Sequence, residues 1–368
     1  LTDQRIQNEI LKEFLNLISK ISMNHQRTTH FIKKIESILT FLKNDIKSNL
    51  SNTSLFNVFR DNKRILLFLF KNKFLNPDKY IYDQLINKDD YIYYFKPELI
   101  FCQTKKYNDN EIFEENREKG ENNDYLCELI RNDSIEEFIT HINKTNLPLK
   151  KAKIELSSFE TNLFLLEKKS ISLIEYAMFF GSIQIVKYLH LNNVVLNPSS
   201  WLFAIHSNNP EMIHFLEDNN VSPVDRSYKE CFIESVKCHH NDIAHYIFDN
   251  YFDSSTTIKD LNDEDILNIY SSSNYEFFPY EIDENKSFFS LVKNDYTELI
   301  NFYFELNKEK IENYINLKSN SDFTEIFEQV LDENKLDIVY DLLFKMTSIP
   351  QKYFRSYKNI TKIALPPS

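Results

Sequence analysis

The chain has 368 residues and a formal net charge of −12, which disfavours nucleic acid and anionic membranes as main partners because phosphate-binding surfaces need clustered Lys and Arg. It contains only two glycines, Gly120 and Gly181, and this nearly excludes a dinucleotide-binding fingerprint or a phosphate-binding loop. The longest uninterrupted apolar run, Ile65–Phe70, is far shorter than the roughly 20 residues that cross a bilayer, so we expect no membrane insertion.

Four cysteines are scattered irregularly through the chain, at Cys102, Cys127, Cys231 and Cys238. In a chain of this length, such spacing fits reduced thiols better than a disulfide framework. No secretion signal is visible, although the sequence opens with Leu1 and not Met, so residues could precede it. We therefore expect an intracellular protein, in the cytoplasm or associated with the cytoskeleton.

Apolar residues recur at helical spacing through residues 4–47 and predict two long amphipathic helices joined by a polar turn. A coiled-coil or partner-helix role is the alternative to core packing, but two heptads are too few to support it. Two shorter helix pairs follow, Ser54–Phe59 with Lys63–Phe70 and Asp78–Ile86 with Asp89–Cys102. Pro97 should disturb the last of these helices, because proline lacks the backbone donor.

A run of mainly aromatic residues, from Tyr91 to Phe95, lies within the second of these pairs. Such a cluster is usually buried between stacked helices, and we predict burial here. An exposed aromatic binding patch is the alternative.

Residues 103–124 have few apolar side chains and many charges, and they mark the clearest change of composition in the chain. We predict a polar charged linker there, separating an N-terminal helical region, residues 1–102, from residues 125–345. Within it, a polar helix should end near Lys119, because Gly120 is typical of a helix end. A flexible loop is the alternative.

Residues 125–345 contain recurring pairs of short helices, of which the clearest is Ser172–Asn197. Each of its two helices has one apolar face, and Gly181 with Ser182 marks the turn between them. Isolated helices below roughly 12 to 15 residues are marginal in water. Neighbouring pairs must therefore cover this one, which predicts a row of similar units.

This unit resembles an ankyrin repeat. Ser172-Leu173-Ile174, Ala177, Gly181, Ile185-Val186-Lys187, Leu189 and Asn193-Val194 lie where ankyrin repeats carry their T-P-L, first Ala, G-H, I/V-V-K, L and G-A positions. More narrowly, the chain is similar to divergent protist ankyrin-repeat proteins in which a helical region of unknown function precedes the repeats. Asn193 and Asn220 replace the usual Gly, and Asn also tolerates the left-handed conformation that ends a helix.

The apolar positions of the second helix recur at Ile135, Ile185, Met212, Ile243, Leu299 and Ile338. Most of the spacings suit single ankyrin units of about 33 residues. The two longer gaps, in which we predict helices near residues 163–166 and 266–270, each fit either two degenerate repeats or one repeat plus an insertion. The resemblance thus implies an all-α fold, an α-solenoid of ankyrin-like helical hairpins with an N-terminal helical region. We expect residues 346–368 to form a C-terminal cap and tail.

The densest group of possible metal ligands comprises Cys231, Cys238, His239, His240 and His245. A zinc site needs four such donors to converge. By alignment with the ankyrin pattern, His239 and His240 occupy the turn and His245 a solvent-facing position. We therefore predict no metal and no cofactor.

Two pairs, Cys238 with His239 and Cys127 with His141, could in principle supply a thiol nucleophile and its base. Sequence neighbours on a helix do not face each other, and no oxyanion site is suggested. We predict no catalytic residues and no small-molecule substrate, hence a protein that is not an enzyme.

The lone tryptophan, Trp201, falls at a position that faces the core in the ankyrin pattern, so we expect it to be buried. Phe179, His206 and Lys237 occupy the same place near the ends of successive first helices. The resemblance puts this rim on the concave face that partners usually touch, which makes these three the candidate partner-binding residues. The alternative is that Phe179 packs under a neighbouring loop.

The resemblance implies a non-catalytic scaffold that binds one or more partner proteins through surface complementarity on its concave face. A rigid curved face loses little ordering entropy on binding. The alternative is a fixed structural component of a large assembly, for example a cytoskeletal lattice.

Overall fold

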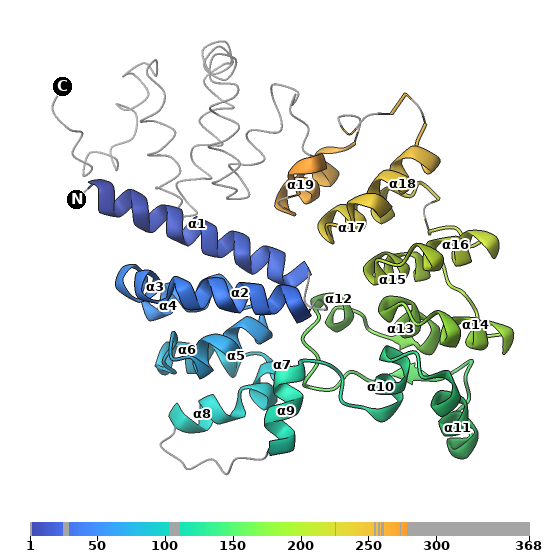
Figure 1. The fold of residues 1–368 in the computed structure, drawn as a ribbon, viewed down its shortest axis with the longest axis horizontal. Helices are drawn as coiled ribbons and strands as arrows, with labels where there is room; N and C mark the ends of the chain where they lie inside the picture. The colour runs from blue at the N-terminus through green and yellow to red at the C-terminus, as the bar shows by residue number, and fades with distance from the viewer. Residues whose placement is uncertain are drawn as a thin grey trace. The chain divides into compact units, whose positions relative to one another are not determined.

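The computed structural model describes residues 2–24, 29–102, 111–224, 226–253, 255–256, 258, 261–272 and 274–277. This part of the chain is almost entirely α-helical, with nineteen α-helices and one two-stranded antiparallel ladder (Figure 1). None of these helices is both long and apolar enough to cross a membrane. The helices predicted around Leu299 and Ile338, and the tail 346–368, lie outside the described residues.

Nine helices make up the N-terminal region. They are α1 (Thr2–Asn24), α2 (Thr29–Phe41), α3 (Lys43–Asn49), α4 (Asn52–Phe59), α5 (Lys63–Lys71), α6 (Lys79–Leu85), α7 (Asp89–Tyr94), α8 (Lys96–Cys102) and α9 (Glu111–Lys119). Side chains cap three of the starts: Ser51, Asn62 and Asp78 each accept a hydrogen bond from a backbone N–H in the first turn. The two predicted long helices are found, but the second is divided at Leu42 into α2 and α3. The helix predicted over Asp89–Cys102 is divided at Phe95, two residues before Pro97.

The apolar faces of α1 to α9 meet in one common core. Its members come from Leu15 on α1 through Leu99 on α8 to Phe113 on α9, and Phe159 joins them from a loop far along the chain. Within the predicted aromatic run, Tyr91, Tyr94 and Phe95 are buried as expected, whereas Ile92 and Tyr93 are partly exposed.

Part of the segment predicted to be a polar linker packs as a helix. α9 ends at Lys119, and Gly120 follows it with φ 64°, as expected from the sequence. Arg117 on α9 is nonetheless buried, and its guanidinium donates to both carboxylate oxygens of Glu98 at 2.8 Å and to Glu114 at 2.7 Å. This paired charge and the burial of Phe113 anchor the segment to the N-terminal core.

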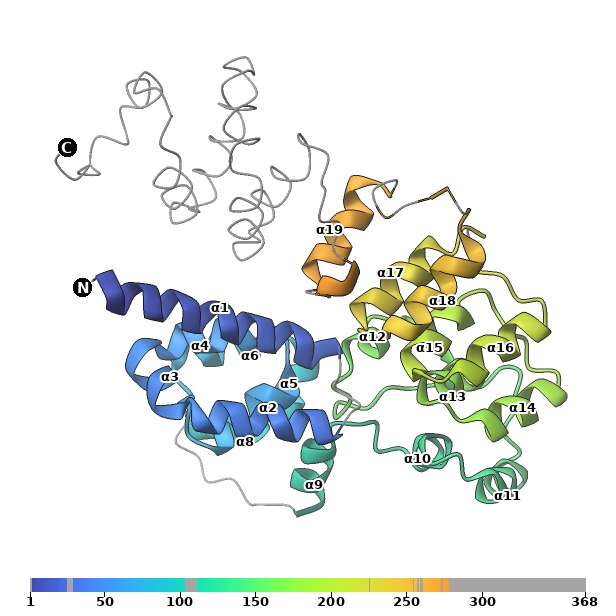
Figure 2. The same ribbon diagram turned by 45° about the horizontal axis from the view of Figure 1, so that its top comes forward.

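Four helical hairpins follow, and we call α10 to α18 the hairpin stack. The hairpins are α10 (Tyr125–Arg131) with α11 (Ile135–Thr145), α13 (Leu173–Phe180) with α14 (Ile183–Leu191), α15 (Ser200–Ser207) with α16 (Pro210–Asp218), and α17 (Lys229–Lys237) with α18 (Asn241–Tyr251). The first helices contact one another in sequence order, α10 with α13, α13 with α15, and α15 with α17 (Figures 1 and 2). Trp201, on α15, is fully buried as predicted, and its indole N–H donates to the carbonyl of Val221 at 2.7 Å.

The long gap between α11 and α13 holds an insertion and not a second worn hairpin. It contains β1 (Lys153–Ile154), the single-turn helix α12 (Leu163–Leu166) and β2 (Ile171–Ser172). The strands pair antiparallel, with Ile154 opposite Ile171. Ser172 then begins α13 with a capping box, in which its hydroxyl accepts from Glu175 N and Glu175 accepts from Ser172 N.

The turns of the four hairpins share one backbone conformation. A single left-handed residue follows each first helix: Asp133, Gly181, Asn208 and His239, with φ between 50° and 74°. A left-handed Asn also follows three of the second helices: Asn146, Asn193 and Asn220. The predicted conformations of Asn193 and Asn220 are therefore confirmed, and their short polar side chains make this conformation tolerable.

Successive hairpins are also joined by a recurring polar contact. Ser182 Oγ, in the turn of the second hairpin, donates to Ile130 O of α10 at 2.5 Å, and His240 Nδ1, in the turn of the fourth, contacts Ile205 O of α15 at 2.8 Å. In the same way, Asn274 Nδ2, from the segment Ser272–Glu276, donates to Val236 O of α17 at 3.0 Å. Each of these carbonyls also accepts a hydrogen bond from the backbone N–H three residues later, so the side chain supplies a second partner. We call these contacts turn-to-carbonyl bonds.

The second helices carry an aromatic series. Their equivalent aromatic residues, Phe138, Tyr188, Phe215 and Tyr246, take part in ring contacts between neighbours: Phe138 with Tyr188, His190 with Phe215, and His214 with Tyr246, with centroids 5.5–6.1 Å apart and near-perpendicular planes. Edge-to-face rings at this distance attract each other.

The described residues divide between two compact units. Residues up to Thr256, together with Ser272–Glu276, belong to the first, while α19 (Asp263–Ser271) and Phe277 belong to the second. In the second unit, Asn262 begins α19 by accepting a hydrogen bond from Asp265 N at 2.9 Å. A short 3-10 turn, Tyr275–Phe277, ends the described part of the chain.

Candidate functional site

A cluster of chemically active side chains lies where the first helices of two neighbouring hairpins end. His206 lies in the last turn of α15, Glu234 in the last turns of α17, and Cys238 ends α17. Because α15 and α17 are packed side by side, residues about one hairpin apart in sequence meet here. We call His206, Glu234 and Cys238 the triad.

The triad is compact and largely shielded. The ligand atoms of its three members all lie within 4.8 Å of one another. His206 Nε2 lies 2.8 Å from Glu234 Oε1, and Cys238 Sγ lies 3.5 Å from His206 Nδ1 and 3.7 Å from Nε2. The imidazole is 10 % exposed, the carboxylate side chain 18 %, and Cys238 2 %.

The carboxyl of Glu234 is held in its ionised form. Burial acts most strongly and opposes ionisation, but the hydrogen bond and charge of His206, together with Lys237 and Lys168, outweigh it and lower the pKa of Glu234 below its ordinary value. Lys237 Nζ lies 3.7 Å from Glu234 Oε2, on the oxygen that does not face His206. One carboxylate oxygen is thus directed to the triad and the other to a lysine.

Two phenylalanines pack against the imidazole of the triad. The ring of Phe164, on α12, lies with its centroid 3.9 Å from that of His206, and Phe179, on α13, stacks on His206 at 5.3 Å. The two phenyl rings also stack on each other, 5.8 Å apart with an interplanar angle of 6°. This packing restricts the rotation of the His206 ring about its own bonds.

The structure corrects one of the three predicted partner-binding residues. Phe179 has no exposed surface, because the insertion that carries Phe164 covers it. Its ring therefore cannot reach a partner, and the alternative of packing under a neighbouring loop is what the structure shows. His206 lies mostly buried in the triad, while Lys237 is 36 % exposed and its role as a partner contact stays a prediction.

The five soft ligands considered from the sequence do not meet at one site. His239 Nε2 contacts Ser272 O at 2.9 Å, His240 Nδ1 contacts Ile205 O, and His245 Nε2 contacts Glu276 Oε1 at 2.6 Å, so each histidine faces a different partner. Only Cys238 joins a potential ligand cluster, and there its partners are His206 and Glu234.

In the structure, members of the two predicted thiol and histidine pairs also have other neighbours. Cys238 Sγ lies 3.5 Å from Nδ1 of His206, which belongs to the neighbouring hairpin. Burial is the main cause that raises the pKa of Cys127 to about 12, which opposes formation of a thiolate. His141 packs edge-on against Tyr125, with ring centroids 5.3 Å apart.

Glu234 is the member of the triad that the sequence interpretation missed. A usable signal was present, because Glu234 lies three residues before Lys237 and therefore on the same helix face, one hairpin after His206. Comparing His206 with residues one hairpin later, instead of with its sequence neighbours, predicts that the carboxyl of Glu234 and the thiol of Cys238 lie opposite its imidazole.

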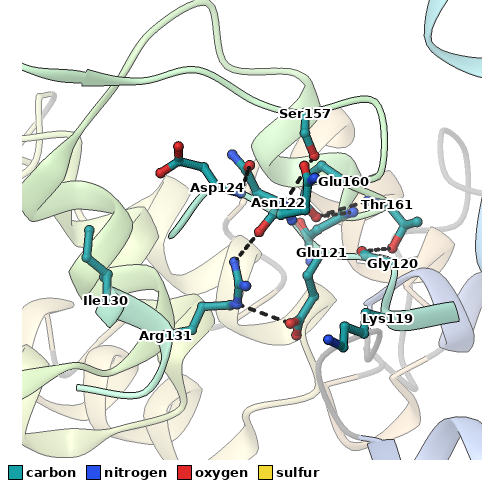
Figure 3. A network of polar contacts seen from close by, with 12 residues as sticks. Lys119, Gly120, Glu121, Asn122, Asp124, Ile130, Arg131, Ser157, Glu160 and Thr161 are labelled. Atoms are coloured by element: carbon teal, nitrogen blue, oxygen red, sulfur yellow. Dashed lines mark hydrogen bonds and ion pairs between the residues drawn. The ribbon is translucent and has the colours of Figure 1, made fainter. Parts of the chain in front are cut away.

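A second polar cluster ties the N-terminal region to the hairpin stack (Figure 3). Glu160 is buried in the loop before α12, where Oε1 accepts from the backbone N–H of Thr161 and Asn162 at 3.0 and 2.9 Å, and Oε2 accepts from Asn122 N at 3.3 Å. Lys63, buried on α5, donates to the carbonyl of Glu160 at 3.1 Å. We call the groups around Glu160 the junction.

Neighbouring contacts complete the junction. Arg131, on α10, donates to Asn122 O at 2.7 Å and pairs with Glu121 at 3.1 Å, and Thr161 Oγ1 donates to Gly120 O at 2.7 Å (Figure 3). Burial raises the pKa of Glu160, against the opposing effect of its backbone hydrogen bonds. Because every carboxylate oxygen of Glu160 faces a backbone donor, the geometry indicates a structural joint and not a substrate site.

Comparison with protein-family models, with curated proteins and with solved structures finds no match for this chain.

Proposed function

We propose that this chain is a non-catalytic scaffold that binds a partner protein, and that the hairpin stack is an ankyrin-like α-solenoid. The observation that carries the proposal is the repeated hairpin plan. Four hairpins use the same left-handed turn, and turn-to-carbonyl bonds of Ser182 and His240 join two pairs of successive hairpins. Such nearest-neighbour stacking is how repeat proteins build extended binding surfaces.

The loops that connect successive hairpins offer apolar contact points for a partner. Val195, between α14 and α15, is 69 % exposed, and Val224, between α16 and α17, is 79 % exposed. Leu191, the last residue of α14, is 80 % exposed. Val195 and Val224 occupy equivalent loops, so they lie one hairpin apart. Exposed apolar side chains that gather on one side of a protein often mark an interaction surface.

The experiment is crosslinking with mass spectrometry of the full chain in a native extract. The double variant Val195→Ser with Val224→Ser removes two exposed methyl-bearing side chains, and we expect it to fold normally and to lose most crosslinks to the stack. The matched control is Phe41→Ser, which changes an equally exposed residue, 85 % exposed, on α2.

The outcomes separate the alternatives. Loss of crosslinks in the double variant alone supports a partner on the stack. Loss in Phe41→Ser alone would instead place the binding surface on the N-terminal region and contradict the proposal. Recovery only in an insoluble assembly, with partners that do not exchange, would favour a fixed structural component.

A further inference from the structure

The triad combines three different metal-ligating groups that come from two packed hairpins. Cys238 supplies a thiol, His206 an imidazole and Glu234 a carboxylate, and all three ligand atoms lie within 4.8 Å of one another. Among the residues that the structure describes, this is the one such group of three. It lies outside the turn-to-carbonyl bonds and the junction, so the stacking of the hairpins does not by itself explain it.

The distances suit a small ion with tetrahedral coordination. Zinc lies about 2.0–2.1 Å from nitrogen or oxygen ligands and about 2.3 Å from sulfur, so tetrahedral ligands are separated by about 3.6 Å for nitrogen and sulfur and about 3.3 Å for nitrogen and oxygen. Cys238 Sγ lies 3.7 Å from His206 Nε2, and Glu234 Oε1 lies 2.8 Å from the same nitrogen. To admit the ion, Glu234 Oε1 has to move about half an ångström away from His206 Nε2. The remaining pair, Cys238 Sγ and Glu234 Oε1, lies within 4.8 Å.

The chemistry of the donors selects the metal. Thiolate and imidazole favour zinc and other late first-row metals, while magnesium and calcium require sites made of oxygen ligands. From these observations, we propose that His206 Nε2, Glu234 Oε1 and Cys238 Sγ bind one zinc ion, with a water molecule as the fourth ligand.

Neighbouring side chains hold the proposed ligands in place, as the outer contacts of a metal site do. The packing of Phe164 and Phe179 on the imidazole fixes the plane in which Nε2 points. The second oxygen of Glu234 faces Lys237, which holds the carboxylate while Oε1 faces the ion. Outer contacts of this kind orient metal ligands and contribute to affinity.

A zinc ion bound there has a structural consequence. His206 belongs to α15, whereas Glu234 and Cys238 belong to α17, so the ion joins two neighbouring hairpins of the stack. Its binding stabilises the native arrangement by mass action, because the unfolded chain does not bring the three ligands together. This inference does not depend on which partner the stack binds.

The test is a titration of the reduced, tag-free full chain with cobalt(II), followed by displacement with zinc. We expect one equivalent of cobalt to bind with the absorption of a tetrahedral site and a thiolate-to-cobalt charge-transfer band, and zinc to abolish both signals. Zinc should also raise the unfolding temperature of the wild-type chain. Absence of the charge-transfer band in the wild-type chain would overturn the proposal.

Variants identify the ligands. Cys238→Ser should remove the charge-transfer band, and His206→Gln should weaken binding by more than the 10- to 100-fold that loss of an outer contact costs. The matched control is Cys231→Ser, which changes an equally buried thiol on the same helix, 2 % exposed like Cys238, and should bind as the wild type does. A band that persists in Cys238→Ser, or that disappears in Cys231→Ser, would contradict the assignment.

The His206→Gln variant keeps the test decisive if Cys238→Ser does not fold. It retains the thiol, so far-ultraviolet circular dichroism can confirm folding while the cobalt titration reports affinity. Unchanged cobalt affinity in a folded His206→Gln protein would overturn the proposal on its own.

Discussion

The N-terminal helices α1 to α9 and the hairpin stack bury their apolar side chains in different ways. In the N-terminal region, residues from Leu15 to Phe113 contribute to one shared core, so helices that are distant in sequence depend on one another. In the stack, the contacts run between neighbouring hairpins, mainly through their first helices, and between the two helices of each hairpin. The first arrangement is a globular core, and the second is a chain of nearest-neighbour interfaces.

This difference predicts how damage spreads. In a shared core, the loss of one side chain affects every helix that packs on it. In a nearest-neighbour array, stability is approximately a sum of unit and interface terms, so a local loss mainly affects the adjacent units. The junction around Glu160 joins the N-terminal core to the hairpin stack. Phe159 belongs to the N-terminal core, whereas Thr161 and Asn162 lead into α12.

Two large-to-small substitutions should show the largest effects. Phe59, on α4, and Trp201, on α15, are both fully buried, and replacing either with Ala should cost about 3–5 kcal/mol of unfolding free energy. Hydrogen exchange with mass spectrometry should show Phe59→Ala loosening α1 to α8 together. The same measurement should show Trp201→Ala loosening mainly α13 to α18.

The matched control for this pair is Phe41→Ala. Phe41 ends α2 but is 85 % exposed, so its truncation should change the unfolding free energy by less than about 0.5 kcal/mol. If Trp201→Ala instead increased exchange throughout the N-terminal region, the stack would not behave as an array of neighbouring units, and the comparison would fail.

A smaller effect, and one that depends on pH, is expected for Glu160→Gln at the junction. Burial raises the folded-state pKa of Glu160 above its ordinary value of 4.5, so the folded chain retains a proton that the unfolded chain releases. The unfolding free energy of the wild type should therefore fall relative to the variant as the pH rises above about 4.5, and level off above the folded-state pKa.

Urea unfolding of both proteins between pH 4 and about 8 measures this difference. A wild-type stability that rises relative to Glu160→Gln over this range would show that the backbone donors of Thr161, Asn162 and Asn122 outweigh burial. In that case the folded-state pKa would lie below its ordinary value.

The same comparison explains how much of the fold the sequence could predict. Helical periodicity predicts most helices of both regions, and Asn193 and Asn220, which follow second helices, are left-handed as expected. The repeat spacing leaves open an insertion or a second degenerate repeat between α11 and α13. Periodicity could not decide between them, because β1 and β2 are two residues each and too short to show alternation. Nor could it predict that the charged segment around Arg117 packs, because its ion partner Glu98 lies on another helix.

The candidate site shows the same limit more sharply. His206 was selected for its position in the repeated pattern, and Cys238 for its residue type, but their contact depends on how α15 and α17 pack. The burial of Phe179 depends on Phe164, which belongs to the insertion that the repeat spacing leaves as one of two alternatives. Residues that meet through regular stacking could be inferred from the repeat spacing, whereas those that meet through the insertion could not.

Substitutions of the two glycines allow a direct comparison of the junction with the stack, because Gly120 lies in the junction and Gly181 in a hairpin turn. Both have positive φ, 64° at Gly120 and 74° at Gly181, so alanine is strained at either position. A Cβ at Gly120 would meet Thr161 Oγ1 at 3.0 Å, whereas at Gly181 the nearest atom is Ser207 Cβ at 3.6 Å, an ordinary contact. We expect Gly181→Ala to cost about 1 kcal/mol and Gly120→Ala about twice that, measured by urea unfolding. Equal costs would show that the junction yields as easily as a hairpin turn.

The smallest effect should come from removing one turn-to-carbonyl bond. Ser182 Oγ is buried and donates to Ile130 O at 2.5 Å, so Ser182→Ala should cost about 0.5–1.5 kcal/mol and increase hydrogen exchange in α10 and the turn before α14. The control is Thr140→Ala, whose exposed hydroxyl donates to Glu136 O within its own helix and should contribute almost nothing. If the two variants were equally stable, the buried hydroxyl of Ser182 would contribute no more than an exposed one, and the coupling between these hairpins would rest on the packing of their helices.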